Sequence, residues 1–318
     1  MTHIPSYDEL PESPVGGRLG WHVFGDDDQV GLVNLLTPER TAEAATLVKR
    51  GVTFGLDHAL GTYEPALNVN RGNPHHHLLS GRGDLTFDDY YDNFFPQGGS
   101  QWDSLAHVGH KPDLFYNGVS ADQIRAAERN TVDHWTRHGI AGRAVVLDIP
   151  ATLQQLGVEY DPSTRFEITV EHLKAAAEQA GITHRTGDIV LLYTGWEEYY
   201  AGLDGEARKA LPKDLVIPGL QQSEETARYL WDIHAAAIAS DNYAVEAWPA
   251  KFGKDEAPFG FLHQMLIGSF GMAIGELWHL SHLVADCRAT GVYEGLLVAA
   301  PLLAPGGVGS TANTVVLK

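Results

Sequence analysis

The chain has 318 residues, with 22 Lys and Arg against 41 Asp and Glu, so its formal net charge is −19. Such acidity argues against nucleic acid as the main partner, because phosphate binding depends on clustered lysine and arginine. No apolar run approaches the roughly 18 residues that a membrane span needs, and no secretory signal is recognisable. Cys287 is the single cysteine, which excludes an internal disulfide framework and a cysteine-based metal cluster. We expect a cytoplasmic protein that binds neither nucleic acid nor a membrane.

Amphipathic segments alternate with short apolar runs along the chain. Helix-capping residues predict helices that begin at Thr37, Thr169, Ser223 and Ser281. Continuous apolar runs predict buried strands covered by helices; these runs are 144–149, 189–193, 235–239 and 296–299. The pattern indicates an α/β or α+β architecture. No linker divides the chain, so we expect one domain over residues 1–318.

Two long segments, 64–99 and 196–222, fit neither the helical nor the strand period. Both are rich in glycine, proline, aromatic and acidic residues. Structureless stretches of this length in a compact domain are usually functional loops or lids. The sequence therefore predicts loops at both places.

The stretch 97–107 is the richest in polar side chains, with Gln97, Gln101, Asp103 and His107. If the backbone is extended from 101 to 103, the side chains of Gln101 and Asp103 share one face. This spacing can place an amide, a carboxylate and an imidazole around one point. The alternative is that these residues, which lie close to glycines, only form turns.

The same stretch resembles a degenerate form of H-x-G-T-H-x-D-x-P-x-H, the signature of the cyclase and bacterial kynurenine formamidase superfamily. Gln97 and Gln101 fall on its first two histidines, Asp103 on its aspartate and His107 on its last histidine. The Q-W-D-x-L-A-H wording is similar to a subgroup of longer members. The similarity extends over 28–40, 134–143, 194–196, 240–242, His263, Glu276, 300–302 and 305–310. The resemblance implies a mixed central β-sheet, or a barrel-like sheet, flanked by helices.

The resemblance also implies a metal site. Two divalent ions lie side by side in the superfamily, and the ligand set of one survives here as Asp103, His263 and Glu276. The other set has lost two histidines to Gln97 and Gln101, and an amide oxygen is a far weaker zinc ligand than an imidazole. We therefore expect one Zn²⁺ or Mn²⁺, or no metal at all.

Roles for the remaining polar residues follow from this site. A metal with an open position acidifies bound water, and His107 is the candidate general base or acid. Gln97 and Gln101 are candidates to donate amide hydrogen bonds to substrate oxygens. A purely structural, hydrogen-bonded pair of His263 and Glu276 is the simpler alternative, and a metal-free catalytic role is a third.

Four further residues are candidate substrate contacts. Trp102 and Trp196, together with Trp248, are candidates to wall an aromatic pocket, although tryptophan is highly buried on average. Asp241 and Asn242 follow a predicted strand, where a turn and a site contact are equally credible.

The sequence thus predicts a hydrolase that acts on an amide, imide or lactone bond of a small cyclic or aromatic carbonyl compound. Water would be activated at a single metal site or by His107. The alternatives are a metal-independent cyclase or dehydratase of secondary metabolism and a catalytically inactive small-molecule binding protein. The resemblance further implies a homodimer or homotetramer.

Overall fold

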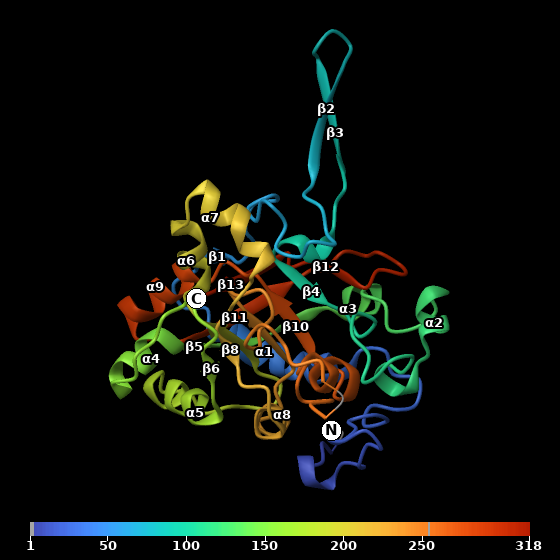
Figure 1. Cartoon of the computed structure of the whole chain (residues 1–318), viewed down its shortest axis with the longest axis vertical. Helices are drawn as coiled ribbons and strands as arrows, with labels where there is room; N and C mark the ends of the chain where they lie inside the picture. Colours follow the sequence, from blue (N-terminus) through green and yellow to red (C-terminus); the bar gives the residue numbers. More distant parts are fainter. Residues whose placement is uncertain (1–2, 254) are drawn as a thin grey trace.

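A nine-stranded mixed sheet forms the centre of the computed structural model, which describes residues 3–253 and 255–318 (Figure 1). The strands, in their order across the sheet, are β1 (Thr53–Gly55), β13 (Thr314–Leu317), β11 (Glu294–Ala299), β5 (Ile140–Asp148), β7 (Ile189–Tyr193), β9 (Ala237–Ser240), β10 (Ala273–Glu276), β4 (Gln101–Asp103) and β12 (Gly309–Thr311). The four strands β5, β7, β9 and β10 run parallel to their neighbours in this group. Every other pairing in this sheet is antiparallel.

Helices flank this sheet, which confirms the predicted mixed sheet with helical cover. The helices are α1 (Pro38–Ala45), α2 (Ala121–Arg125), α3 (Asp133–His138), α4 (Ile149–Leu156), α5 (Val170–Gln179), α6 (Trp196–Gly202), α7 (Gly205–Ala210), α8 (Glu224–Asp232) and α9 (Ser281–Thr290). Helices α1, α5 and α9 pack on β5, and α4 packs on β7. Because the central strands are covered on both sides, their residues are apolar throughout.

The four predicted helices and the four predicted strands are present. The side chains of Thr37, Thr169 and Ser223 cap α1, α5 and α8, each by accepting a backbone N–H bond. Gly291 ends α9 in the left-handed conformation, with φ 71°, where glycine carries no steric penalty. Cys287 of α9 is fully buried. Among the described residues, no helix has both the length and the apolarity to cross a bilayer.

The prediction of a structureless loop over 64–99 is wrong. The segment contains a hairpin of β2 (His75–Gly81) and β3 (Thr86–Asp92). This hairpin projects from the body of the protein (Figure 1). All residues of β3 are exposed, and β2 is almost as exposed. Since neither face of the hairpin is buried, its sequence carries no alternation of apolar and polar residues, and the strand period was absent for that reason.

The segment 196–222 is also more regular than predicted. It contains α6, α7 and β8 (Gly219–Leu220), and β8 pairs with β6 (Glu167–Ile168). Elements of two to seven residues are too short to show a hydrophobic period. The remaining helical turns are η1 (Tyr7–Glu9), η2 (Gly31–Leu35), η3 (Pro96–Gly98), η4 (Tyr116–Gly118), η5 (Leu211–Lys213) and the π-helical η6 (Gln264–Ser269).

Candidate active site

Asp103, His263 and Glu276 come together although they are far apart in the sequence. Asp103 ends β4, Glu276 ends β10, and His263 immediately precedes η6. All three side chains are buried, and one ligand atom from each lies within 4.8 Å of the others. The antiparallel pairing of β4 and β10 places Gln101 opposite Glu276 and Asp103 opposite Ile274.

The Asp103 carboxylate is the most unusual group of this cluster. Its side chain is about 1% exposed, yet neither carboxylate oxygen has a hydrogen-bond partner among the described residues. The His107 imidazole lies close by, with its Nε2 3.6 Å from Asp103 Oδ1. A buried carboxylate without partners costs several kcal/mol, so such groups are normally paired or bind a metal ion.

His263 is oriented by Glu246, a residue that the sequence did not indicate. His263 Nδ1 lies 2.6 Å from Glu246 Oε1, and its Nε2 lies 3.0 Å from Glu276 Oε1. The Glu246 carboxylate also accepts the backbone N–H groups of Leu262 and His263. Burial acts to lower the pKa of His263, but the hydrogen bonds to Glu246 and Glu276 prevail and raise it to about 10. An imidazole held through Nδ1 by a carboxylate, with Nε2 facing the site, is the usual arrangement of a metal-binding histidine.

Gln101 is used differently from the prediction. Its Nε2 donates to Glu276 Oε2 at 2.5 Å, while its Oε1 is buried and accepts no hydrogen bond from any residue that the structure describes. One N–H of the Gln101 amide is therefore used in the bond to Glu276. The second N–H and the acceptor Oε1 remain for other groups. Burial and the negative charge of Asp103 raise the pKa of Glu276 to about 7.

Gln97 lies in η3 and is 8% exposed. Its amide rests on Gly309, which pairs with Asp103 across β12 and β4. A Cβ atom on Gly309 would lie only 2.3 Å from Gln97 Nε2, so glycine permits this close approach. The backbone carbonyl of Gln97 accepts a hydrogen bond from the Arg71 side chain. The positive charge of Arg71 opposes the upward shift of the Glu276 pKa and adds to the downward shift of the His107 pKa. Arg71 was not predicted, because it lies in the supposed loop.

His107 lies at the open side of this cluster, with a side chain that is 23% exposed. Burial lowers the pKa of its imidazole below the ordinary value; the charge of Asp103 opposes this shift, and Arg71 reinforces it. The imidazole is therefore neutral at neutral pH. A neutral imidazole close to a carboxylate can accept a proton from water or from a substrate.

Trp102 and Trp196 are not brought to the site. Both are fully buried. Trp102 points to the opposite face of β4 from Gln101 and Asp103, packs edge-on against Trp278 at 4.7 Å, and donates its indole N–H to the Ala312 carbonyl. Trp196 stacks on Tyr200 at 5.6 Å within a second apolar cluster. These are the contacts of core residues, and hydrophobic character alone does not distinguish core from pocket wall.

Asp241 and Asn242 are also fully buried, and their polar atoms are used within the chain. Asp241 accepts hydrogen bonds from the backbone and hydroxyl of Thr194. Asn242 donates to the Pro218 carbonyl and accepts from the Val245 backbone. Of the two readings left open by the sequence, the structure favours the strand-end turn.

An aromatic groove leads toward His263. Tyr243, Trp248 and Phe252 line an open groove of about 630 Å³, and their rings lie 5.7 and 6.0 Å apart in succession. Phe261 continues the series, because it lies 5.2 Å from Phe252 and stacks on His263 at 4.7 Å. Burial raises the pKa of Tyr243, and the Glu276 and Asp103 charges contribute to this shift while the Arg71 charge opposes it.

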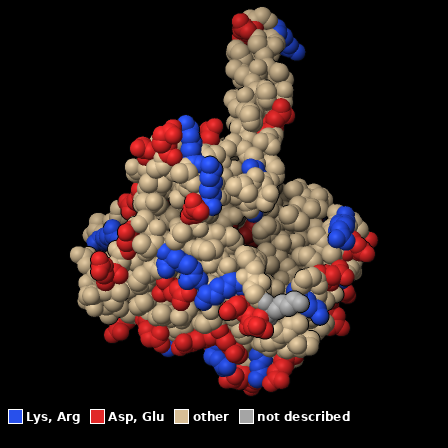
Figure 2. Space-filling view, in the orientation of Figure 1, with Lys and Arg blue, Asp and Glu red and all other residues tan. Residues whose placement is uncertain are grey.

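The residues present fit a divalent cation. The three donors are one imidazole and two carboxylates, which suit zinc or manganese. The unpartnered oxygens of Asp103 and Gln101 supply acceptors that no described donor satisfies. Figure 2 shows that the surface is hollowed at the foot of the hairpin, where acidic atoms appear at the bottom.

The fold and this carboxylate–histidine cluster define an α/β protein with a potential metal centre at the end of its sheet. The sequence matches the family model described as Cyclase over residues 39–247, which is more than half of the chain. The chain belongs to the cyclase family. The match includes Asp103 and His107 and ends before His263 and Glu276.

Solved structures agree with this assignment. A crystal structure described as a novel cyclase is 30% identical, with a TM-score of 0.82, over 94% of this chain and 99% of the other. Isatin hydrolase A from Labrenzia aggregata, bound to benzyl benzoate, is 17% identical, with a TM-score of 0.60, over 83% of this chain and 93% of the other. An isatin hydrolase bound to the product analogue thioisatinate is 17% identical, with a TM-score of 0.61, over 84% of this chain and 92% of the other. The likeness to the isatin hydrolases is one of fold. No curated protein sequence matches the chain.

Proposed function

We propose that the chain is a hydrolase that opens an amide, imide or lactone bond in a small cyclic or aromatic carbonyl compound. The observation that carries this proposal is the buried Asp103 carboxylate, which lies close to His263 and Glu276 and whose two oxygens have no hydrogen-bond partner in the part of the chain that the structure describes. An arrangement that leaves a carboxylate unpaired costs stability, and such a cost is typical of functional sites.

Asp103, His263 and Glu276 would hold one Zn²⁺ or Mn²⁺, which when bound supplies a Lewis acid for the carbonyl and lowers the pKa of water. Glu246 orients His263 so that its Nε2 faces this position. Gln101 fixes Glu276 through its amide N–H and adds its oxygen to the polar lining.

His107 is the general base in this proposal. Its neutral imidazole lies at the edge of the cluster, 3.6 Å from Asp103, where it can take the proton of the attacking water and return it to the leaving nitrogen or oxygen. Gln97, which is packed against Gly309, is the candidate donor to the substrate oxygen.

The aromatic groove supports the substrate class. Rings from Tyr243 to Phe261 form a surface on which a planar ring can stack. Arg71 adds a positive charge beside Gln97, which suits the carboxylate that ring opening produces. The isatin hydrolases with the same fold make isatin a sensible first substrate to test.

The test is turnover of isatin, N-formylkynurenine and simple aromatic lactones by purified protein, before and after treatment with a chelator. We expect turnover that the chelator abolishes and that added Mn²⁺ or Zn²⁺ restores. The Asp103→Asn variant should show no turnover, whereas the control variant Asp122→Asn, at an exposed position, should retain the wild-type turnover. Chelator-resistant turnover would favour a metal-independent cyclase or dehydratase, and tight binding without turnover would favour a binding protein; either result would contradict the proposal.

We also propose that the chain forms a homo-oligomer through the β2–β3 hairpin. A two-stranded hairpin is only marginally stable alone in water, yet this one exposes Leu78, Leu79, Leu85 and Phe87 by at least half of their surface. The face of the hairpin seen in Figure 2 is largely uncharged, although β3 also exposes Asp88, Asp89 and Asp92. Light scattering should give a dimer or tetramer for the full chain, and Leu79→Asp with Phe87→Asp should give a smaller species.

A further inference from the structure

A second group of metal-ligating side chains lies outside the candidate active site. It consists of His58, which follows β1, Glu197 in the first turn of α6, and His279, which lies between β10 and α9. One ligand atom from each lies within 4.8 Å of the others. The three residues come from three separate segments, so only the tertiary fold brings them together.

Glu197 is fixed at the centre of this group. Its side chain is about 3% exposed, and its Oε1 accepts the backbone N–H groups of Leu280 and Ser281 at the start of α9. Its Oε2 is left to face the two imidazoles. His279 Nδ1 lies 2.7 Å from this oxygen, and His58 Nε2 lies 3.2 Å from it.

The histidines are not satisfied by hydrogen bonds alone. His58 Nε2 is buried and, despite its distance from Glu197, has no partner with hydrogen-bond geometry among the described residues. The His58 and His279 rings are 4.6 Å apart, and a third imidazole, His282, stacks on His279 at 4.3 Å.

We propose that His58 Nε2, Glu197 Oε2 and His279 Nδ1 form a second zinc site. Two imidazoles and one carboxylate match the nitrogen and oxygen ligands that Zn²⁺ takes in proteins, with a fourth position left for water. His279 is 39% exposed, so this position opens to solvent. The ion would tie the segment after β1 and the first turn of α6 to the start of α9.

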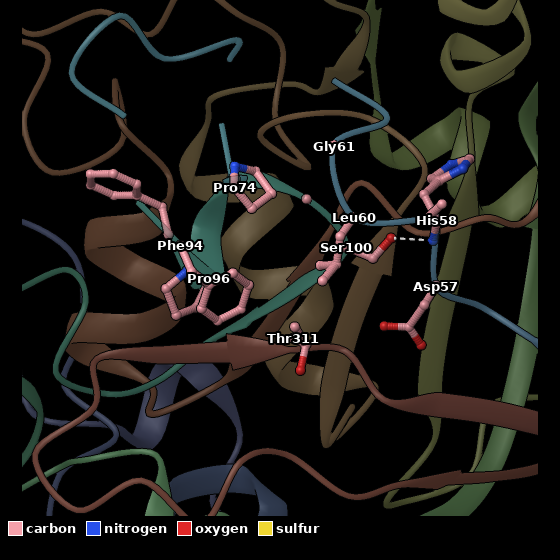
Figure 3. A pocket seen from close by; sticks show the side chains of 13 residues that line it. Asp57, His58, Leu60, Gly61, Pro74, Phe94, Pro96, Ser100 and Thr311 are labelled. Carbon is pink, nitrogen blue, oxygen red and sulfur yellow. Dashed lines mark hydrogen bonds between the residues drawn. The ribbon is translucent and has the colours of Figure 1, made fainter. Parts of the chain in front are cut away.

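This site is connected to the first one through the backbone. The His58 backbone N–H donates to Ser100 Oγ at 2.8 Å, and Ser100 Oγ donates to the Leu277 carbonyl at 2.6 Å. Figure 3 shows the first of these bonds and shows the His58 ring pointing away from the Asp57 carboxylate. Ser100 precedes Gln101, and Leu277 follows Glu276. Zinc at the second site would therefore fix the backbone beside both of these active-site residues.

The inference is tested by counting the zinc bound per folded chain. Apoprotein is prepared with a chelator, dialysed against Zn²⁺, and analysed by elemental mass spectrometry, with circular dichroism to verify the fold. Asp103→Asn removes the first site, so this variant should bind one equivalent. Adding His279→Gln or His58→Gln to it should remove that equivalent, with an affinity loss of more than about 100-fold.

His76→Gln is the matched control, because His76 also lies 3.0 Å from a carboxylate, but at the exposed hairpin. In the Asp103→Asn background it should leave the bound equivalent in place. Zinc should also raise the melting temperature of Asp103→Asn and not that of the double variant.

The inference is overturned if folded Asp103→Asn binds no zinc, or if His279→Gln and His58→Gln leave its zinc unchanged. Both results are independent of catalysis. If Asp103→Asn instead retained everything that the wild type binds, the first site would fail while the second could still be identified by its own two variants.

Discussion

Asp103→Asn is expected to stabilise the protein when no divalent cation is present. In the wild type the Asp103 carboxylate is buried, and neither oxygen has a hydrogen-bond partner within residues 3–253 and 255–318. Its charge also contributes to the raised pKa of Glu276. The substitution keeps the shape of the side chain and removes its charge.

The magnitude follows from the number of unsatisfied atoms. Each buried unsatisfied polar group costs about 1–3 kcal/mol, and the new amide still leaves some of this cost in place. We therefore expect a net gain of about 1–3 kcal/mol in the free energy of unfolding, or roughly 2–6 °C in melting temperature for a chain of this size. With the metal at about 1,000 times its Kd, the wild type gains about 4 kcal/mol, and the order of stability reverses.

The assay is thermal and urea unfolding at pH 8, first with a chelator and then with excess Mn²⁺ or Zn²⁺. Zinc can also bind at the proposed site of His58, Glu197 and His279, which both proteins share. Asp188→Asn is the control, because Asp188 is equally buried but accepts two hydrogen bonds from Arg143. Removing one member of such a pair should destabilise by about 3–5 kcal/mol. Destabilisation of Asp103→Asn in chelator, similar to that of the control, would refute the reasoning and make Asp103 a structural residue.

Three further predictions concern the proposed reaction. His107→Gln should lower kcat by a factor of about 10²–10⁴ with little change in KM, and an unchanged kcat would exclude His107 as the base. In the wild type, the acid limb of the kcat/KM pH profile should lie below the ordinary pKa of histidine, because burial lowers the pKa of His107. Glu246→Gln should weaken metal binding about 10–100-fold by calorimetry, since Glu246 orients His263, whereas an unaltered Kd would assign it to folding alone. Trp248→Ala should raise KM more than it lowers kcat if the groove binds the substrate ring, and equal KM values would place the substrate elsewhere.

The regular elements were predictable where burial produces a continuous apolar run or a capped, amphipathic segment, whereas short buried strands such as β4 and β10 were not predicted. The apolar runs of β5, β7 and β9 and the capped helix α5 carry this signal directly. The β2–β3 hairpin was missed because it has no buried face, and burial is what imposes the alternation on a strand.

The candidate site divides in the same way. The resemblance to the cyclase family indicated Asp103 and His107 from the signature stretch, and it indicated His263 and Glu276 as single residues of the wider similarity. It gave no indication of Glu246, whose contact with His263 arises from the folding of distant segments.

The sequence by itself thus determined the local elements and the family of this protein, since both are expressed in short stretches of the chain. Which side chains meet was decided only by the tertiary structure. It committed the Gln101 amide to Glu276, buried Trp102 and Trp196 in apolar clusters, and gathered His58, Glu197 and His279. The physical reason is that hydrogen bonding and ligation depend on distances of about 2–3 Å between atoms, and sequence spacing does not specify such distances once the chain has turned back on itself.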